Sequence, residues 1–291
     1  MPDQPVAIEC GTPGVDELPG LSEVLAGWQR TGDPVQLHSG DVGWFWRFGA
    51  RRTADALRVW RYDGQVRAIG LLDEPEYLRL AIDPDFRADA VLAEALAADS
   101  ARVVTPGEAF VDAPEGAAVR GILLALDGWG LDDAWQPLIR DLAAPVEDSG
   151  LTVEVVTAET AAERTAVQRA AFDGSTFTDE RWHEMAAGTP YRDGRCLLGR
   201  DGAGHAVAAV TVWSAGAGRP GILEPMGVHR EFRGVGYGQA ITLAAAAALR
   251  ELGASEAVVH TPSFNTGAVA TYQSAGFSLQ PEIRAARRLP Q

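Results

Sequence analysis

The sequence contains little cysteine and carries an excess of negative charge. Two cysteines, Cys10 and Cys196, occur among the 291 residues, and they fit neither a metal spacing nor a disulfide framework. This usage is typical of a reducing compartment, so we expect a cytoplasmic protein. With 40 acidic against 25 basic residues, the net charge is −15. Such a chain is a poor candidate for binding nucleic acids or anionic membranes. The charge weakly favours a cationic substrate such as an amine, but general solubility is the simpler explanation.

Long apolar runs and metal-ligand spacings are also missing. Residues 1–10 contain no basic segment followed by an apolar run, so we expect no signal peptide there. The most apolar later stretch, Ala240–Leu249, is too short for a membrane span, which needs roughly 20 residues. The five histidines do not pair at metal-ligand spacing, and we expect no metal. Apolar residues still make up 46% of the chain, which is ample for the cores of two domains.

Two segments of the chain, 146 residues apart, resemble each other. Leu80–Arg87 (LAIDPDFR) is similar to Met226–Arg233 (MGVHREFR): in both, an apolar strand leads into a polar turn, an aromatic residue and an arginine. Two fainter pairs follow in the same order, 148 residues apart, namely Val111–Pro114 with Val259–Pro262 and Gly128-Trp129 with Gly276-Phe277. We interpret the chain as a tandem duplication of one domain type.

The predicted seam between the two copies lies near Ala143–Gly150, a stretch rich in proline, glycine and acidic residues. We therefore predict domains at residues 1–147 and 148–291. In the second domain we expect strands at Leu151–Thr157, Arg195–Arg200, Ala206–Ser214, Gly221–His229 and Ala257–Thr261. We expect helices at Ala158–Phe172, Thr178–Ala187, Gly236–Leu252 and Thr266–Ala275, and we expect Phe277–Leu289 to close the same sheet. This order indicates a mixed α/β fold rather than the regular alternation of a Rossmann domain.

The strongest local signal is the glycine-rich segment Arg233–Gly238 (RGVGYG), between a predicted strand and a long predicted helix. Glycines allow a tight turn and the close approach of a ligand. The N–H groups of the first helical turn, the helix dipole and Arg233 would together attract an anion. The spacing G-x-G-x-G departs from the G-x-G-x-x-G of dinucleotide-binding proteins, which disfavours a nicotinamide oxidoreductase. A glycine-rich turn without any ligand is the structural alternative.

Val228–Gly238 (VHREFRGVGYG) resembles the acyl-CoA motif Q/R-x-x-G-x-G/A of the GNAT superfamily of N-acetyltransferases. The resemblance implies two tandem GNAT-like domains, each a mixed, mostly antiparallel sheet flanked by helices. It implies that the CoA pyrophosphate is bound by backbone N–H groups of Arg233, Gly234, Val235, Gly236, Tyr237 and Gly238. It also implies that the backbone of Met226, Gly227 and Val228 pairs with the pantetheine arm, and that the Val228 N–H polarises the thioester carbonyl.

A second segment downstream, Asn265–Phe277, resembles the N-x-x-A-x-x-x-Y-x-x-x-G-F segment of the same superfamily. Asn265, Ala268 and Tyr272 are three and four residues apart, so they share one face of a predicted helix. The resemblance implies that Ala268 leaves room for the cofactor and that Tyr272 stands near the sulfur as a general acid. A tyrosine in the core of an amphipathic helix is the structural alternative.

The first copy has lost these features. Its loop reads Arg87–Leu92 (RADAVL), without glycine, and Asp89 would place negative charge against a pyrophosphate. Ala117 and Leu124 stand where the second copy has Asn265 and Tyr272. We therefore expect residues 1–147 to be a degenerate copy that binds no acyl-CoA and supports the second half.

Direct acyl transfer needs a base to accept the proton of the attacking amine. Glu224 is the candidate, because it shares even parity with Met226 and Val228 on one predicted strand, which would place it on their face. Pro225 next to it cannot donate to a strand ladder, so we expect the sheet to be interrupted there. Solvation of Glu224 at the surface is the alternative reading. His229 and His260 are secondary candidates for a proton relay.

These observations predict an acetyltransferase. The expected reaction moves an acetyl or other acyl group from acetyl-CoA to a primary amine of a small molecule, by direct attack in a ternary complex. The expected partners are acetyl-CoA and the amine, with no metal, no nucleic acid and no membrane, and a homodimer is allowed. A non-catalytic acyl-CoA-binding sensor or scaffold is the alternative function.

Overall fold

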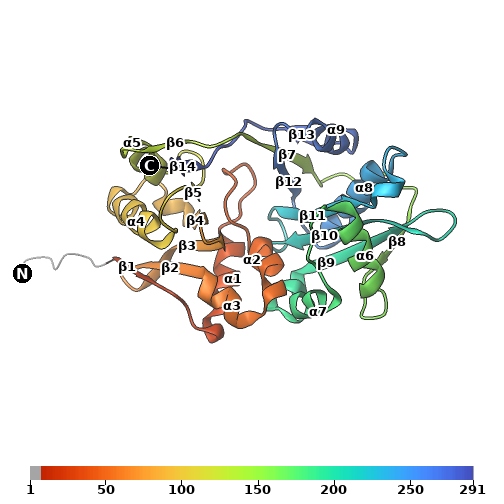
Figure 1. Cartoon of the computed structure of the whole chain (residues 1–291), viewed down its shortest axis with the longest axis horizontal. Coiled ribbons are helices and arrows are strands. Elements are labelled where there is room, and N and C mark those ends of the chain that lie inside the picture. The colour runs from red at the N-terminus through yellow and green to blue at the C-terminus, as the bar shows by residue number, and fades with distance from the viewer. Residues whose placement is uncertain (1–7, 291) are drawn as a thin grey trace, which may run out of the picture. The chain divides into compact units, whose positions relative to one another are not determined.

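The part of the chain that the structure describes contains two seven-stranded sheets, each belonging to one compact unit (Figure 1). The computed structural model describes residues 8–290. The first unit takes in the chain up to His38, Ala50–Ala134 and the chain from Ile283 onward, and the second unit takes in Ser39–Gly49 and Trp135–Glu282. Each sheet has one parallel strand pair among otherwise antiparallel pairs, which confirms the predicted fold class.

The sheet of the second unit has the strand order β13-β7-β12-β11-β10-β9-β8. Its strands are β7 (Trp135–Asp141), β8 (Thr152–Val155), β9 (Gly194–Arg200), β10 (Ala206–Ser214), β11 (Gly221–Val228), β12 (Glu256–Pro262) and β13 (Ser278–Leu279). Its helices are α2 (Ser39–Phe45), α6 (Ala161–Ala171), α7 (Asp179–Ala187), α8 (Tyr237–Glu251) and α9 (Thr266–Ser274), with 3₁₀ turns η2 (Trp46–Phe48), η4 (Thr189–Asp193) and η5 (Arg230–Phe232).

The sheet of the first unit has the order β1-β2-β3-β4-β5-β14-β6. Its strands are β1 (Ile8–Gly11), β2 (Leu57–Tyr62), β3 (Gln65–Glu74), β4 (Tyr77–Ile82), β5 (Ala109–Asp112), β6 (Trp129–Leu131) and β14 (Ala286–Arg288). Its helices are α1 (Leu18–Gly27), α3 (Ala50–Ala56), α4 (Ala90–Val103) and α5 (Ala118–Ala125), with 3₁₀ turns η1 (Val15–Glu17) and η3 (Pro84–Phe86).

The helix α8 (Tyr237–Glu251) shows why the positions of helices could be predicted from the sequence. Ile241, Ala245 and Ala248 recur at helical spacing and are buried in the core cluster of the second unit. The helix ends before Gly253, whose φ of +82° is the left-handed conformation that follows many helices. Periodicity and terminal residues therefore placed this element to within a residue or two.

The last strands of the two copies are exchanged. β7 precedes the predicted seam, yet it lies in the second sheet between β12 and β13. β14, near the end of the chain, lies in the first sheet between β5 and β6. The expectation that Phe277–Leu289 closes the second sheet is therefore wrong beyond β13. A short strand can pair with either of two similar sheets, and its residue pattern does not indicate which.

A second crossing of the chain occurs at Ser39–Gly49, which belongs to the second unit although it lies in the first half. There α2 packs on β10, β11 and η4, and η2 packs on α7. Compact units and sequence halves therefore differ, and the boundary between residues 147 and 148 stays a prediction of where the duplicated copies meet.

Removing Ile283–Gln291 should destabilise the first unit, because it deletes β14 and exposes the edges of β5 and β6. Ladder hydrogen bonds contribute on the order of 1 kcal/mol each, so we expect the free energy of unfolding to fall by several kcal/mol. Thermal unfolding and size-exclusion chromatography would show the loss and the resulting association. The control is a chain ending at Leu289, which keeps β14. An unchanged melting temperature in the longer deletion would contradict the exchange.

Candidate active site

The second sheet opens between β11 and β12. These parallel strands are in register at Gly221 with Ala257 and at Ile222 with Val258, and within the described residues their pairing ends there. On its other edge β11 stays paired with β10 as far as Val228. The sheet is thus interrupted next to Pro225, as the sequence predicted.

The open edge carries the backbone of Met226 and Val228. The N–H of His229 donates to the carbonyl of Val207, on the side of β10. Since backbone groups alternate along an antiparallel strand, the N–H of Val228 is directed to the opposite side, toward the opening. This is the edge that an extended ligand could pair with as an added strand.

A β-bulge lies at Glu224 and Pro225. Val210 is opposite Met226 and Val212 is opposite Leu223. Glu224 and Pro225 on β11 therefore face a single residue on β10, Thr211. The bulge breaks the alternation on which the predicted orientation of Glu224 rested. Even parity predicted that Glu224 shares the face of Met226 and Val228. It is instead Leu223 that packs in the same core cluster as those two residues. Glu224 itself is half-buried, and its carbonyl accepts a hydrogen bond from Nε1 of Trp213 at 2.9 Å.

The turn after β11 is held against the end of α6. Arg233 donates from Nη2 to the carbonyl of Ala171 at 2.6 Å, and Arg230 donates from Nε to the carbonyl of Ala170 at 2.8 Å. Two guanidinium groups therefore cap the negative end of the α6 dipole. His229 also has a local role, because its Nδ1 accepts a hydrogen bond from the N–H of Glu231.

The glycines of the loop serve two different purposes. Gly236 has a φ of +94° at the N-cap of α8, and a Cβ there would meet no atom within 4 Å. It therefore gives a left-handed turn with open space beside it. At Gly238 a Cβ would lie 2.9 Å from Cγ2 of Thr271, so this glycine lets α8 pack closely on α9.

A surface pocket of about 360 Å³ adjoins this loop. It is lined by Asp148–Leu151, Val235–Tyr237, Gln239, Ala240 and Leu243. The first N–H groups of a helix have no partner within the helix, so the start of α8 offers donors beside this space. Binding of a phosphate group at this loop stays a prediction, for which the structure offers a pocket beside the start of α8.

The helix α9 brings Tyr272 into the cluster that also contains Met226 and Val228. Tyr272 is 6% exposed, and burial raises the pKa of its hydroxyl to about 12. Ala268 packs against the same cluster. Asn265 is the N-cap of α9, where its Oδ1 accepts a hydrogen bond from the N–H of Ala268 at 3.2 Å. Residues far apart in the sequence thus converge on one side of the open sheet.

Sequence reasoning missed Arg164, on α6. Its side chain is 1% exposed, donates from Nη2 to Oγ1 of Thr211 at 3.1 Å, and lies 4.3 Å over the ring of Phe177. Burial lowers the pKa of the guanidinium. Thr211 lies on β10 opposite the bulge. The Arg164 guanidinium therefore bonds to the residue that faces Glu224 and Pro225 across the two strands. An arginine among alanines on a helix gives no sign of burial.

In the first unit the equivalent strand edge is occupied by the chain itself. The pairing of β4 with β5 ends at Arg79, as the pairing of β11 ends at Ile222. Beyond it, the N–H of Ile82 donates to Oε1 of Gln36 at 3.1 Å, and the N–H of Leu37 donates to the carbonyl of Leu80 at 3.2 Å. Leu80 and Ile82 are 146 residues before Met226 and Val228. The first copy therefore fills the place that the second leaves open.

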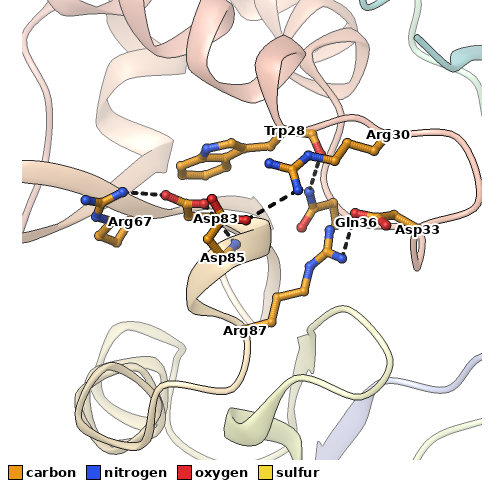
Figure 2. Close-up of polar contacts among 8 residues, drawn as sticks. All are labelled: Trp28, Arg30, Asp33, Gln36, Arg67, Asp83, Asp85 and Arg87. Atoms are coloured by element: carbon orange, nitrogen blue, oxygen red, sulfur yellow. Dashed lines mark hydrogen bonds and ion pairs between the residues drawn. The ribbon is translucent and has the colours of Figure 1, made fainter.

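The turn after β4 is also neutralised internally (Figure 2). Arg87 pairs with Asp33 at 2.9 Å, Asp83 with Arg67 at 2.6 Å and Asp85 with Arg30 at 3.4 Å. The carboxylate of Asp89 accepts a hydrogen bond from the N–H of Leu92 at 2.8 Å, at the start of α4. A protein anion thus takes the position that a phosphate would take at a helix N-terminus.

Two absences concern the described residues 8–290. No helix there is long and apolar enough to cross a membrane. No group of three or more histidine, cysteine, aspartate or glutamate residues there could hold a metal ion.

Residues 161–277 match the sequence model of the acetyltransferase (GNAT) family. This part of the second half is therefore similar to the GNAT acetyltransferases, a family that uses acyl-CoA. Among curated proteins, no sequence matches the chain significantly.

Solved structures show that the whole chain has a tandem GNAT fold. A tandem GNAT protein from the clavulanic acid biosynthesis pathway superimposes with a TM-score of 0.59 at 17% identity, covering 97% of this chain and 98% of that one. A GCN5-related N-acetyltransferase from Sphaerobacter thermophilus gives 0.55 at 19% identity, covering 96% and 95%. An acetyltransferase from Colwellia psychrerythraea gives 0.57 at 16% identity, covering 98% and 100%.

Replacing Gly236 by valine should abolish acetyl-CoA binding, which we expect at one molecule per wild-type chain. The new side chain would fill the space beside the loop, and losing two charge-assisted hydrogen bonds of about 1.5–3 kcal/mol each weakens binding about 100-fold or more. Isothermal titration calorimetry measures both the affinity for acetyl-CoA and the number of molecules bound per chain.

The matched control is Gly204→Val in the hairpin turn between β9 and β10. Gly204 has a φ of +87° with open space around it, so the backbone strain is alike. The control should bind normally. A folded Gly236→Val protein that still binds one acetyl-CoA would place the binding elsewhere, the first copy included.

Proposed function

We propose that this protein transfers an acetyl group from acetyl-CoA to a primary amine of a small molecule, by direct attack in a ternary complex. The single observation that carries the proposal is the open edge of β11 beside the glycine loop at the start of α8, within a GNAT domain. A net charge of −15 suits a cationic acceptor better than nucleic acid or a membrane surface. We also propose that it works in the cytoplasm, in keeping with its two unpaired cysteines.

In this proposal the backbone binds the donor. The loop N–H groups from Arg233 to Gly238 hold the pyrophosphate, supported by the α8 dipole. The edge of Met226, Gly227 and Val228 pairs with the amide groups of the pantetheine arm. The Val228 N–H then donates to the thioester carbonyl, whose oxygen gains negative charge as the amine attacks. Asn265 and Ala268 keep the start of α9 clear of the donor.

Glu224 is proposed as the general base. The amine must lose a proton to form the amide, and a carboxylate beside the opening can take it directly or through one water molecule. The half-buried bulge brings its backbone to the point where β11 leaves β12. We include His229 only as a structural cap, given its bond to the Glu231 N–H.

Tyr272 is proposed as the general acid. A hydroxyl whose pKa is raised to about 12 keeps its proton throughout the neutral and mildly alkaline range. Because it stays protonated, the hydroxyl can hydrogen-bond to the thiolate that leaves as the amide forms, or protonate it. The phenol would stabilise the developing negative charge on sulfur in the transition state.

A non-catalytic acyl-CoA sensor is the second candidate, and the deep burial of Tyr272 in the core cluster is the observation that favours it. Release of free thiol from acetyl-CoA in the presence of a panel of small amines distinguishes the two. All 25 basic residues are arginine, so the protein has no lysine that could consume acetyl groups. Thiol release that no amine accelerates, together with tight acetyl-CoA binding, would favour the sensor.

Replacing Glu224 by glutamine should lower kcat about 100-fold or more below the pKa of the amine. The deficit should shrink as pH rises, because solvent then supplies neutral amine without a base. Acetyl-CoA affinity should hardly change. The control is Glu163→Gln on α6, where the carboxylate pairs with Arg200. A rise in KM with an unchanged pH profile of kcat would instead assign Glu224 to substrate orientation.

Replacing Tyr272 by phenylalanine should lower kcat about 100-fold with little effect on acetyl-CoA binding, since the hydroxyl acts mainly in the transition state. Tyr77→Phe in the first unit is the matched control, because both rings pack on a phenylalanine, Tyr272 at 6.0 Å from Phe277 and Tyr77 at 5.6 Å from Phe110. Single-turnover kinetics would isolate the chemical step. Equal rates for the two variants would remove Tyr272 from the mechanism.

A further inference from the structure

We infer that Trp213 is a positioning residue for Glu224, and that α2, supplied by the first half of the chain, holds Trp213 in place. The inference rests on the proposed function, because it takes Glu224 as the base.

Trp213 holds the bulge through a single directed bond. Its Nε1 donates to the carbonyl of Glu224 at 2.9 Å, from the neighbouring strand β10. A bulge leaves the ladder locally disrupted, so the backbone there lacks part of its usual restraint. The indole N–H replaces that restraint at the residue whose side chain has to be placed. A fixed peptide group at Glu224 in turn limits where its carboxylate can go.

The indole has almost no freedom to move. It is 1% exposed, and it lies between two glycines on different elements. A Cβ added at Gly43 of α2 would lie 2.5 Å from the indole, and one added at Gly194 of β9 would lie 2.7 Å from it. Tyr191 of η4 meets the same ring edge-on at 5.9 Å. Glycine at both positions is thus what makes room for tryptophan.

The helix α2 thereby gives the first half a part in the second unit's site. The preceding residues, Gln36 and Leu37, are fixed on the closed edge of β4. The next residues, Ser39–Phe45, form α2 and pack on β10 and β11. The first half of the chain therefore contributes to the second unit the segment that holds Trp213.

Two variants test the inference on the full-length protein. Trp213→Phe keeps an aromatic ring and removes the N–H, and Gly43→Ala pushes the indole away. Their controls are Trp60→Phe, which removes a buried indole N–H bonded to Asp99 in the first unit, and Gly121→Ala in α5, where a Cβ meets nothing within 4 Å. Hydrogen exchange of Gly221–Val228 reports on the bulge without requiring activity.

We expect faster exchange of Gly221–Val228 in Trp213→Phe and Gly43→Ala and in neither control. We also expect kcat with the best amine of the panel to fall about 10- to 100-fold, as a displacement near 1 Å can cause. Its pH profile should approach that of Glu224→Gln, with acetyl-CoA affinity unchanged.

Three results would overturn the inference. Unchanged exchange would show that Trp213 does not restrain the bulge. Faster exchange with a wild-type pH profile would leave Trp213 as a packing residue only. If no amine of the panel accelerates thiol release by the wild-type protein, the proposed function fails first. Any effect on hydrogen exchange then describes a structural contact without a positioning role.

Discussion

The structure depends on the point where β11 leaves β12. A strand whose edge lacks a neighbour exposes backbone N–H and C=O groups, and such groups need partners when water is excluded. The protein meets this requirement in two ways. In the first unit, the chain supplies Gln36 and Leu37 as the partners of Ile82 and Leu80. In the second unit the described pairing of β11 with β12 ends at Ile222, and we propose that a ligand pairs with the edge beyond it. The glycine loop follows directly.

The loss of a site that we expect in the first copy would involve more than the motif residues. Arg87 of the turn pairs with Asp33, and Asp83 of the turn pairs with Arg67. Asp89 caps α4 at the helix N-terminus, where an anion such as phosphate would be favoured. In each case a side chain of the protein occupies a position where a group of a ligand would otherwise be bound. The result is an internally satisfied fold, which explains how a copy without glycines at Arg87–Leu92 keeps the same strand order around its split.

The sequence was sufficient for whatever depends on local periodicity and on short motifs. The amphipathic stripe and terminal glycine of α8 located that helix, and the proline after Glu224 correctly indicated an interrupted sheet. The duplication followed from two similar strand–turn segments. The predicted roles of Glu224, Tyr272 and the loop residues stay predictions.

The remainder depended on long-range pairing. Nothing local distinguishes a strand that pairs within its own copy from β7 and β14, which pair in the other sheet. A bulge adds one residue and reverses parity, so counting along β11 could not orient Glu224. Arg164 and Trp213 were missed because the environment of a buried cation or indole is created by elements distant in sequence, such as α2.

The exchange of the last strands also bears on how the protein is made. Domains in a chain usually fold in order as they leave the ribosome, the N-terminal one first. Here the first sheet lacks the strand that joins β5 to β6 until residues 286–288 have been synthesised, because β14 lies between them. The earlier copy must therefore wait for the later one, holding an incomplete sheet throughout translation. Duplication has produced two similar folds, but the second sheet has all of its strands once β13 has been made, whereas the first still needs β14.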